Sequence, residues 1–330
     1  MVTATQIKAL LNSVKNQDKE HFCDIALQIA TKEESNGHIK ISNEIKEIIK
    51  DIKNISSENS FKKQVVNFVE PTGELKSILE AEYSSIKLND LILNNSLKKR
   101  LDRIIIEQNS IAKLREFNLL PRSKILLAGL PGTGKTLTAK AIAGTLRLPI
   151  FTIQLDKLIT KYMGETSVKL RLIFDHIKKY RGVYFFDEFD AIGSSRSLDN
   201  DVGEIRRVLN TLLQFIEQSS SDSIIIAATN HIDLLDKALF RRFDDILEYI
   251  LPEEDLIEKV FKINLHTLDV AKINWKDITK NSLGLSFDDI VKICNDIKKK
   301  ILLDNKTIDN ELINIIITEK RANIHGSSKD

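Results

Sequence analysis

An eight-residue segment, residues 129–136, most constrains what this chain can fold into. It reads Gly-Leu-Pro-Gly-Thr-Gly-Lys-Thr, which fits the pattern G-x-x-x-x-G-K-[ST]. An apolar run precedes it at 125–128, and residues 137–146 after it have the apolar spacing of a helix. Strand, tight turn and helix together direct several backbone N–H groups and the positive end of a helix at one anion. The segment therefore predicts a site for a nucleoside triphosphate.

Each residue type in this loop has a role in phosphate chemistry. Glycines let the backbone turn toward the phosphates, a lysine ammonium neutralises the outer phosphates, and a threonine hydroxyl binds Mg²⁺. We therefore expect Lys135 to contact phosphate and Thr136 to contact the metal ion. The predicted nucleotide-contacting residues are Gly129, Pro131, Gly132, Thr133, Gly134, Lys135, Thr136 and Leu137.

A pair of carboxylates follows a second apolar run, residues 183–186, which is typical of a buried strand. On its own, this pattern would indicate a strand followed by a solvated acidic turn. Phosphoryl transfer, however, requires a carboxylate for the metal and a group that orients the nucleophile. Beside a phosphate-binding loop, the pair therefore predicts that Asp187 holds Mg²⁺, directly or through water, and that Glu188 polarises the attacking water.

Three further polar residues have both a structural and a catalytic interpretation. Asn230 follows the apolar run 223–229, where its amide either caps a turn or reaches the γ-phosphate or the attacking water. Arg241 and Arg242 are adjacent among apolar residues, and they are either surface charges or arginine fingers that stabilise the transferred phosphoryl group.

Strand and helix patterns alternate from residue 124 to residue 250, which predicts an α/β fold with a parallel sheet and helices on both faces. After Pro252 the pattern becomes helical. We predict three domains: a helical N-terminal domain with a linker over 1–85, a large α/β domain over 86–252, and a small helical domain with a disordered tail over 253–330. The N-terminal part is either a stabilising appendage or a domain that binds a substrate or partner.

The order of these motifs resembles that of AAA ATPases over roughly residues 88–320. The loop at 129–136 matches the Walker A motif of that family, Asp187-Glu188 matches Walker B, and Asn230 matches sensor 1. The resemblance implies a P-loop NTPase sheet that is followed by a small helical lid, with Leu91-Ile92 as an apolar contact for adenine. The stretch 284–290 resembles sensor 2, although Phe287-Asp288-Asp289 stands where the family usually has Gly-Ala-Asp.

Two other motifs resemble katanin- and spastin-like members of the family. Arg241 and Arg242 match their compact arginine pair, which implies action on the γ-phosphate of a neighbouring subunit in a ring, usually a hexamer. Lys161, Tyr162 and Met163 resemble the aromatic pore loop, which implies a grip on an extended polypeptide in the central channel. The alternative is that Tyr162 and Met163 are core residues that close a turn.

Composition limits the remaining function classes. The net charge of +2 over 330 residues disfavours a nucleic-acid motor, and no apolar run is long enough to span a membrane, so we expect a cytoplasmic protein. Two cysteines without paired spacing predict neither a disulfide nor a zinc site. The chain has no H-E-x-x-H motif, so no metalloprotease is fused to it.

Two interpretations of the function remain after these exclusions. The first is chaperone-like remodelling of a protein substrate driven by ATP and Mg²⁺, and the alternative is a nucleotide-dependent switch that regulates a partner. Similar bacterial stand-alone AAA ATPases are often encoded beside a subtilisin-like serine protease, some of them in phage-defence pairs. That resemblance implies a protease partner.

Overall fold

The computed structural model describes residues 26, 29, 30, 34, 38, 41–47, 71, 73–158, 163–189, 202–232, 240–304 and 307–326. The chain divides into two compact units, Met1–Asn67 and Phe68–Asp330. In the first unit residues 41–47 are helical and Ala26, Ile29 and Ala30 are buried, in agreement with the predicted helical character. The predicted linker around residues 54–60 lies outside the described residues.

The second unit is built on one six-stranded sheet with the order β1-β3-β4-β5-β2-β6. The strands from β2 to β6 run parallel, as predicted, whereas β1 pairs antiparallel with β3. The strands are β1 (Leu79–Glu82), β2 (Lys124–Gly129), β3 (Ile150–Ile153), β4 (Val183–Phe186), β5 (Ile224–Thr229) and β6 (Asp245–Tyr249). The predicted boundary at residue 85 assigned β1 to the N-terminal part, but β1 pairs with β3 and belongs to the second unit.

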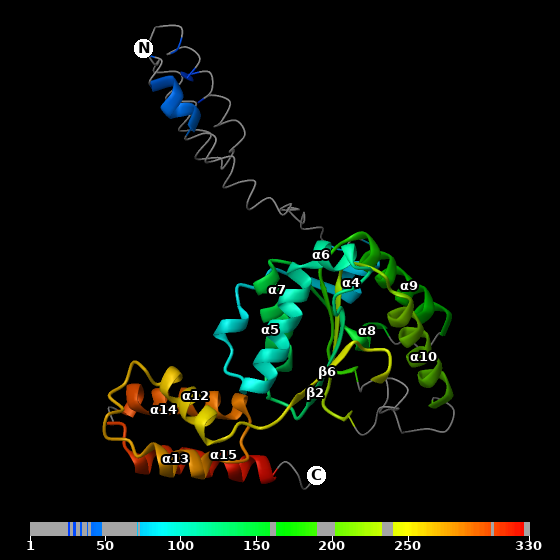
Figure 1. The fold of residues 1–330 in the computed structure, drawn as a ribbon. Coiled ribbons are helices and arrows are strands. Elements are labelled where there is room, and N and C mark those ends of the chain that lie inside the picture. Colours follow the sequence, from blue (N-terminus) through cyan, green and yellow to red (C-terminus); the bar gives the residue numbers. More distant parts are fainter. Residues whose placement is uncertain are drawn as a thin grey trace. The chain divides into compact units, whose positions relative to one another are not determined.

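Helices cover both faces of this sheet (Figure 1). The covering and connecting helices are α4 (Leu75–Ile78), η1 (Leu88–Asp90), α5 (Asn95–Asn109), α6 (Ile111–Glu116), α7 (Lys135–Leu146), α8 (Leu155–Leu158), α9 (Met163–Lys179) and α10 (Val202–Gln218). One core joins the inner faces of α9 and α10 to alternate strand residues such as Tyr184 and Phe186. Side chains alternate between the two faces of a strand, so Phe185 points to the opposite face, where α5 and α7 lie (Figure 1).

A helical subdomain of four helices follows β6 and has a hydrophobic core of its own. Its helices are α12 (Glu254–Asn264), α13 (Trp275–Ser282), α14 (Phe287–Asp304) and α15 (Asn310–Gly326). All four lie after Pro252, in the stretch whose pattern predicted a small helical domain. The disordered tail was predicted over residues 326–330, but Gly326 is the last residue of α15, and residues 327–330 lie outside the described residues. Among the residues that the structure describes, no helix combines the length and the apolar character needed to cross a membrane.

Candidate nucleotide-binding site

The strand order brings the predicted catalytic residues to one edge of the sheet. Strand β5 lies between β2 and β4, with Ala128 paired to Thr229 and Phe186 paired to Ala227. Because parallel strands end at the same edge, the segments that follow these three strands are neighbours. Those segments carry the phosphate-binding loop (residues 129–136, hereafter the phosphate loop), Asp187 and Asn230.

The phosphate loop connects β2 to α7, as the strand-turn-helix pattern predicted. At two of its glycines, close neighbouring atoms leave no room for a side chain. A Cβ at Gly129 would lie 2.1 Å from the backbone oxygen of Tyr249, and a Cβ at Gly132 would lie 2.5 Å from Ser286 Oγ. Gly132 also has φ +73° and Gly134 has φ +98°, in the left-handed region that favours glycine. The loop therefore depends on glycine for both its backbone shape and its packing.

Lys135, the first residue of α7, is buried in the phosphate loop with only 8% of its surface exposed. Its ammonium donates hydrogen bonds to the backbone oxygens of Gly129, at 2.7 Å, and Leu130, at 2.9 Å. A cation held inside the loop beside the start of a helix makes this concavity strongly favourable for an anion. These residues therefore suit a polyphosphate.

Thr136 and Asp187 lie in contact, although they are 51 positions apart in the sequence. The Thr136 hydroxyl donates to Asp187 Oδ2 over 3.0 Å. Hydroxyl and carboxylate oxygens are the hard ligands that Mg²⁺ prefers, so this pair fits the predicted metal site. Glu188 is exposed at the same edge with φ +50°, an uncommon backbone conformation for a non-glycine residue, and its N–H donates to Asp187 Oδ1 over 2.9 Å.

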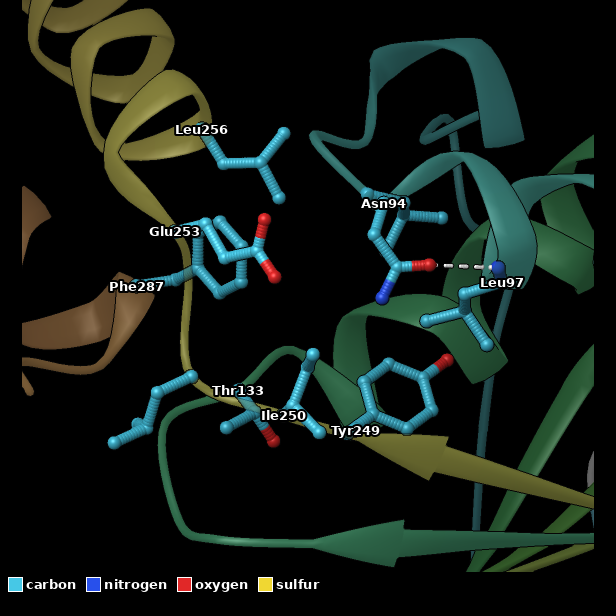
Figure 2. Close-up of a pocket in the computed structure, with 10 residues that line it drawn as sticks. Asn94, Leu97, Thr133, Tyr249, Ile250, Glu253, Leu256 and Phe287 are labelled. Carbon is cyan, nitrogen blue, oxygen red and sulfur yellow. Dashed lines mark hydrogen bonds between the residues drawn. The ribbon is translucent and has the colours of Figure 1, made fainter.

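A narrow crevice lies between the phosphate loop and the helical subdomain (Figure 2). Leu256, Glu253 and Phe287 approach it from the subdomain, and Asn94 and Leu97 approach it from the start of α5. Asn94 caps α5 by accepting a hydrogen bond of 2.7 Å from the Leu97 backbone.

Sequence analysis missed most residues that line this crevice. Ile92, one of the two residues predicted to contact adenine, packs against the core of the helical subdomain, and the neighbouring Leu93 and Asn94 line the crevice. The Asn-x-x-Leu start of α5 was a usable N-cap signal at this point. No local pattern indicated that Tyr249, Glu253 and Phe287 converge here, because they meet only through the tertiary fold.

The arginine pair lies at the opposite edge of the sheet from the phosphate loop. Asp244 accepts a hydrogen bond of 2.9 Å from the backbone N–H of Lys124, the first residue of β2, so the turn at 240–243 is fixed beside the amino end of that strand. Arg241 is exposed, whereas Arg242 Nε lies 3.2 Å from Glu217 Oε2 on α10 of the same chain. The two arginines, which the sequence analysis treated as equivalent, therefore have different surroundings in the structure.

The predicted pore loop falls only partly within the described residues. Lys161 and Tyr162 lie outside them, and Met163 is the first residue of α9. Leu137, which was predicted to contact nucleotide, lies on α7 with 45% of its surface exposed. Pro131 is exposed in the loop, and Thr133 is buried with its hydroxyl donating to the Leu130 oxygen over 2.7 Å.

Comparison with known proteins identifies the family. Residues 125–250 match the model of the ATPase family associated with various cellular activities (AAA). The chain is 35% identical over 245 residues to an uncharacterized AAA family ATPase, y4kL, of Sinorhizobium fredii. The aligned region covers 73% of this chain and 72% of the relative.

Two other relatives are matched over less of their length. A proteasome-activating nucleotidase of Methanoregula boonei is 38% identical over 54% of this chain and 43% of its own length. An ATP-dependent zinc metalloprotease FtsH of Helicobacter pylori is 30% identical over 68% of this chain and 37% of its own length. The chain thus spans less than half of these two relatives. With the phosphate loop and its neighbouring carboxylate in place, these similarities show that the chain belongs to the AAA family and is an ATPase.

Proposed function

We propose that this ATPase assembles into a ring, of six subunits by family analogy, and uses hydrolysis to remodel a protein substrate. The observation that carries the proposal is the separation of the phosphate loop from the arginine pair. The two lie at opposite ends of β2, whose five residue steps from Lys124 to Gly129 span about 17 Å at about 3.3 Å per residue. That separation exceeds the reach of an arginine side chain, so a nucleotide contacted by Arg241 or Arg242 would be that of a neighbouring subunit.

Within one subunit the remaining residues have complementary roles. Lys135 neutralises the outer phosphates. Thr136 and Asp187 hold Mg²⁺, and the bound ion would offset negative charge on the phosphates. Glu188 orients and polarises the attacking water, and Asn230 fixes its position from the end of β5. Each of these assignments is supported by the placement of the residue at the carboxyl edge of the sheet.

The crevice supports a link between nucleotide binding and motion of the helical subdomain. The crevice is lined by Asn94 and, from the helical subdomain, by Phe287 and Leu256, so a base bound in it would contact both parts of the chain. Motion of the subdomain relative to the sheet is then transmitted to the loop that carries Tyr162. We propose that Lys161, Tyr162 and Met163 grip an extended polypeptide and that the motion pulls it.

The names of two relatives favour a protein substrate and a link to proteolysis. One is called a proteasome-activating nucleotidase and the other a metalloprotease. We therefore propose that it acts in the cytoplasm beside a separate protease, with residues 1–85 binding the substrate or that partner.

Unfolding of a reporter tests the proposal in the full-length protein. The reporter is a green fluorescent protein with an unstructured tail, whose fluorescence is lost when it is unfolded. We expect loss of fluorescence with ATP, and no loss with the Glu188→Gln variant, which retains ATP binding but not turnover. Tyr162→Ala should lower the unfolding achieved per ATP hydrolysed, whereas Tyr162→Phe, the matched aromatic control, should retain it.

The same proteins separate remodelling from the switch alternative. Light scattering of Glu188→Gln should show a rise to ring mass when ATP is added. Ring formation and brisk hydrolysis without any loss of reporter fluorescence would instead favour a nucleotide-dependent switch. If the rate of ATP hydrolysis per subunit did not depend on protein concentration, a nucleotide site formed between two subunits would be contradicted.

A further inference from the structure

The start of α14 is in direct contact with the phosphate loop. The backbone N–H of Asp288 donates to the Gly132 oxygen over 3.2 Å. It is one of the N–H groups at a helix start that have no partner within the helix, so the phosphate loop satisfies it. Ser286 lies on the other side of the same glycine, 8% exposed, at a position that an added Cβ on Gly132 would strike. The helical subdomain therefore fixes the loop through one hydrogen bond and one close packing contact.

Ser286 is itself held in place by Asp289. The Ser286 hydroxyl donates to Asp289 Oδ2 over 2.6 Å and accepts from the Asp289 N–H over 3.2 Å. Asp289 Oδ2 also accepts from the Ser286 N–H over 3.2 Å. This reciprocal arrangement is a capping box at the start of α14, with aspartate in the place of the usual glutamate or glutamine. It leaves the Ser286 side chain little freedom to move away from Gly132.

Lys320 extends this network to the last helix of the subdomain. Its ammonium lies 3.3 Å from Asp289 Oδ1, with the lysine side chain 24% exposed and the aspartate side chain 20% exposed. Burial alone would raise the pKa of Asp289, but the hydrogen bonds from Ser286 and the ion pair with Lys320 outweigh it and lower that pKa. The carboxylate is therefore held in its charged form by both partners.

We propose that Lys320, through Asp289 and Ser286, is a positioning residue that holds the phosphate loop in its nucleotide-binding shape. The chain of contacts runs from α15 to the start of α14 and then to Gly132. Lys320 does not touch the nucleotide in this arrangement. Its effect is to keep α14 seated on the loop, so that the loop amides remain directed at the phosphates.

A second ion pair between the same two helices supplies a matched control. Lys300 on α14 lies 3.2 Å from Glu319 on α15, and its side chain is 34% exposed. Lys300 is 11 positions beyond Asp289, about 16 Å along a helix that rises about 1.5 Å per residue. Loss of Lys300 therefore removes a comparable link between α14 and α15 without reaching the phosphate loop.

Nucleotide affinity in the full-length protein tests this role, with a fluorescent N-methylanthraniloyl ATP as the probe. We expect Lys320→Met and Asp289→Asn each to raise Kd about five-fold, which corresponds to about 1 kcal/mol. Lys320→Arg keeps the ion pair and should retain the original Kd. Lys300→Met should leave Kd unchanged even if it lowers the melting temperature.

Hydrogen exchange in the nucleotide-free protein gives a readout that is independent of activity. Amides of the peptide that contains residues 129–137 should exchange faster in Lys320→Met and at the original rate in Lys300→Met. Equal changes in the two lysine variants, in Kd or in exchange, would reduce Lys320 to a general stabilising role and overturn the proposal. Unchanged Kd in both Lys320→Met and Asp289→Asn would overturn it as well.

Discussion

Substitution of Gly132 by alanine measures how tightly the helical subdomain holds the phosphate loop. Alanine at φ +73° suffers left-handed strain of about 1–2 kcal/mol. The added Cβ would also lie 2.5 Å from Ser286 Oγ and 3.0 Å from Ser286 Cβ. Ser286 is buried and held by its capping box, so we assign this overlap a typical overpacking cost of about 1–3 kcal/mol.

Gly134 provides the matched control for this prediction, because it has φ +98° and an added Cβ there meets no atom within 4 Å. Gly134→Ala should therefore cost only the backbone strain, about 1–2 kcal/mol. A domain of this size loses about 2–4 °C of melting temperature per kcal/mol. We expect nucleotide-free Gly132→Ala to melt about 2–12 °C below Gly134→Ala, measured by circular dichroism.

A double variant tests whether the extra loss comes from the contact itself. Ser286→Gly removes the Oγ and Cβ atoms of Ser286 that an alanine at position 132 would strike, and it leaves Asp288 Cβ at 3.1 Å. In that background the difference between Gly132→Ala and Gly134→Ala should become smaller, by up to about 3 kcal/mol. A Gly132→Ala protein that melts as high as Gly134→Ala, or a difference that Ser286→Gly leaves intact, would refute the inferred contact.

Two other predictions follow from the arginine pair and from the buried cysteine. A chain that carries both Arg241→Ala and Arg242→Ala should lose about 10³-fold or more in turnover, and mixing it with a Lys135→Ala chain should restore part of it, because each chain supplies what the other lacks. Steady-state ATPase assays across mixing ratios check this, and no recovery at any ratio would contradict action between subunits. Cys294 is fully buried in the helical subdomain, and burial raises the pKa of its thiol to about 12. In a Cys23→Ser background this thiol should react with Ellman's reagent at pH 8 only after unfolding, and rapid labelling of the folded protein would contradict its burial. Because the unfolded thiol ionises at lower pH than the folded one, this group favours the folded state below about pH 9 and that contribution is lost as pH rises toward 12.

Local patterns in the sequence predicted the parts of the fold that have local causes. The phosphate loop was predicted from glycines that lie between an apolar strand pattern and a helical pattern, and the structure has β2 before the loop and α7 after it. The apolar run before Asp187 is β4, buried along its whole length. By contrast, β1 has only four residues and a partly exposed burial pattern, so its pairing with β3 depends on tertiary contacts that no short pattern reveals.

In the candidate site, too, local patterns predicted some features, while others depend on tertiary contacts. Glycine, lysine and aspartate at set spacings predicted residues that the fold brings together, and the contact between Thr136 and Asp187 agrees with that prediction. The sequence alone did not indicate that Ser286 faces Gly132, because 154 positions separate them and they meet only through the tertiary fold. Nor could it separate Arg241 from Arg242, since the distinction arises from Glu217 on a different helix.

The geometry of the site also explains why hydrolysis and motion should be coupled in this chain. Gly132 contacts the helical subdomain on one side and belongs to the loop that binds phosphate on the other. A change at the phosphates that shifts this loop must therefore either move the start of α14 or break its hydrogen bond with Gly132. Because α14 shares a closely packed core with α12, α13 and α15, the lower-energy response is for the four helices to move as one body. We therefore expect a displacement of Gly132 to move the four helices together.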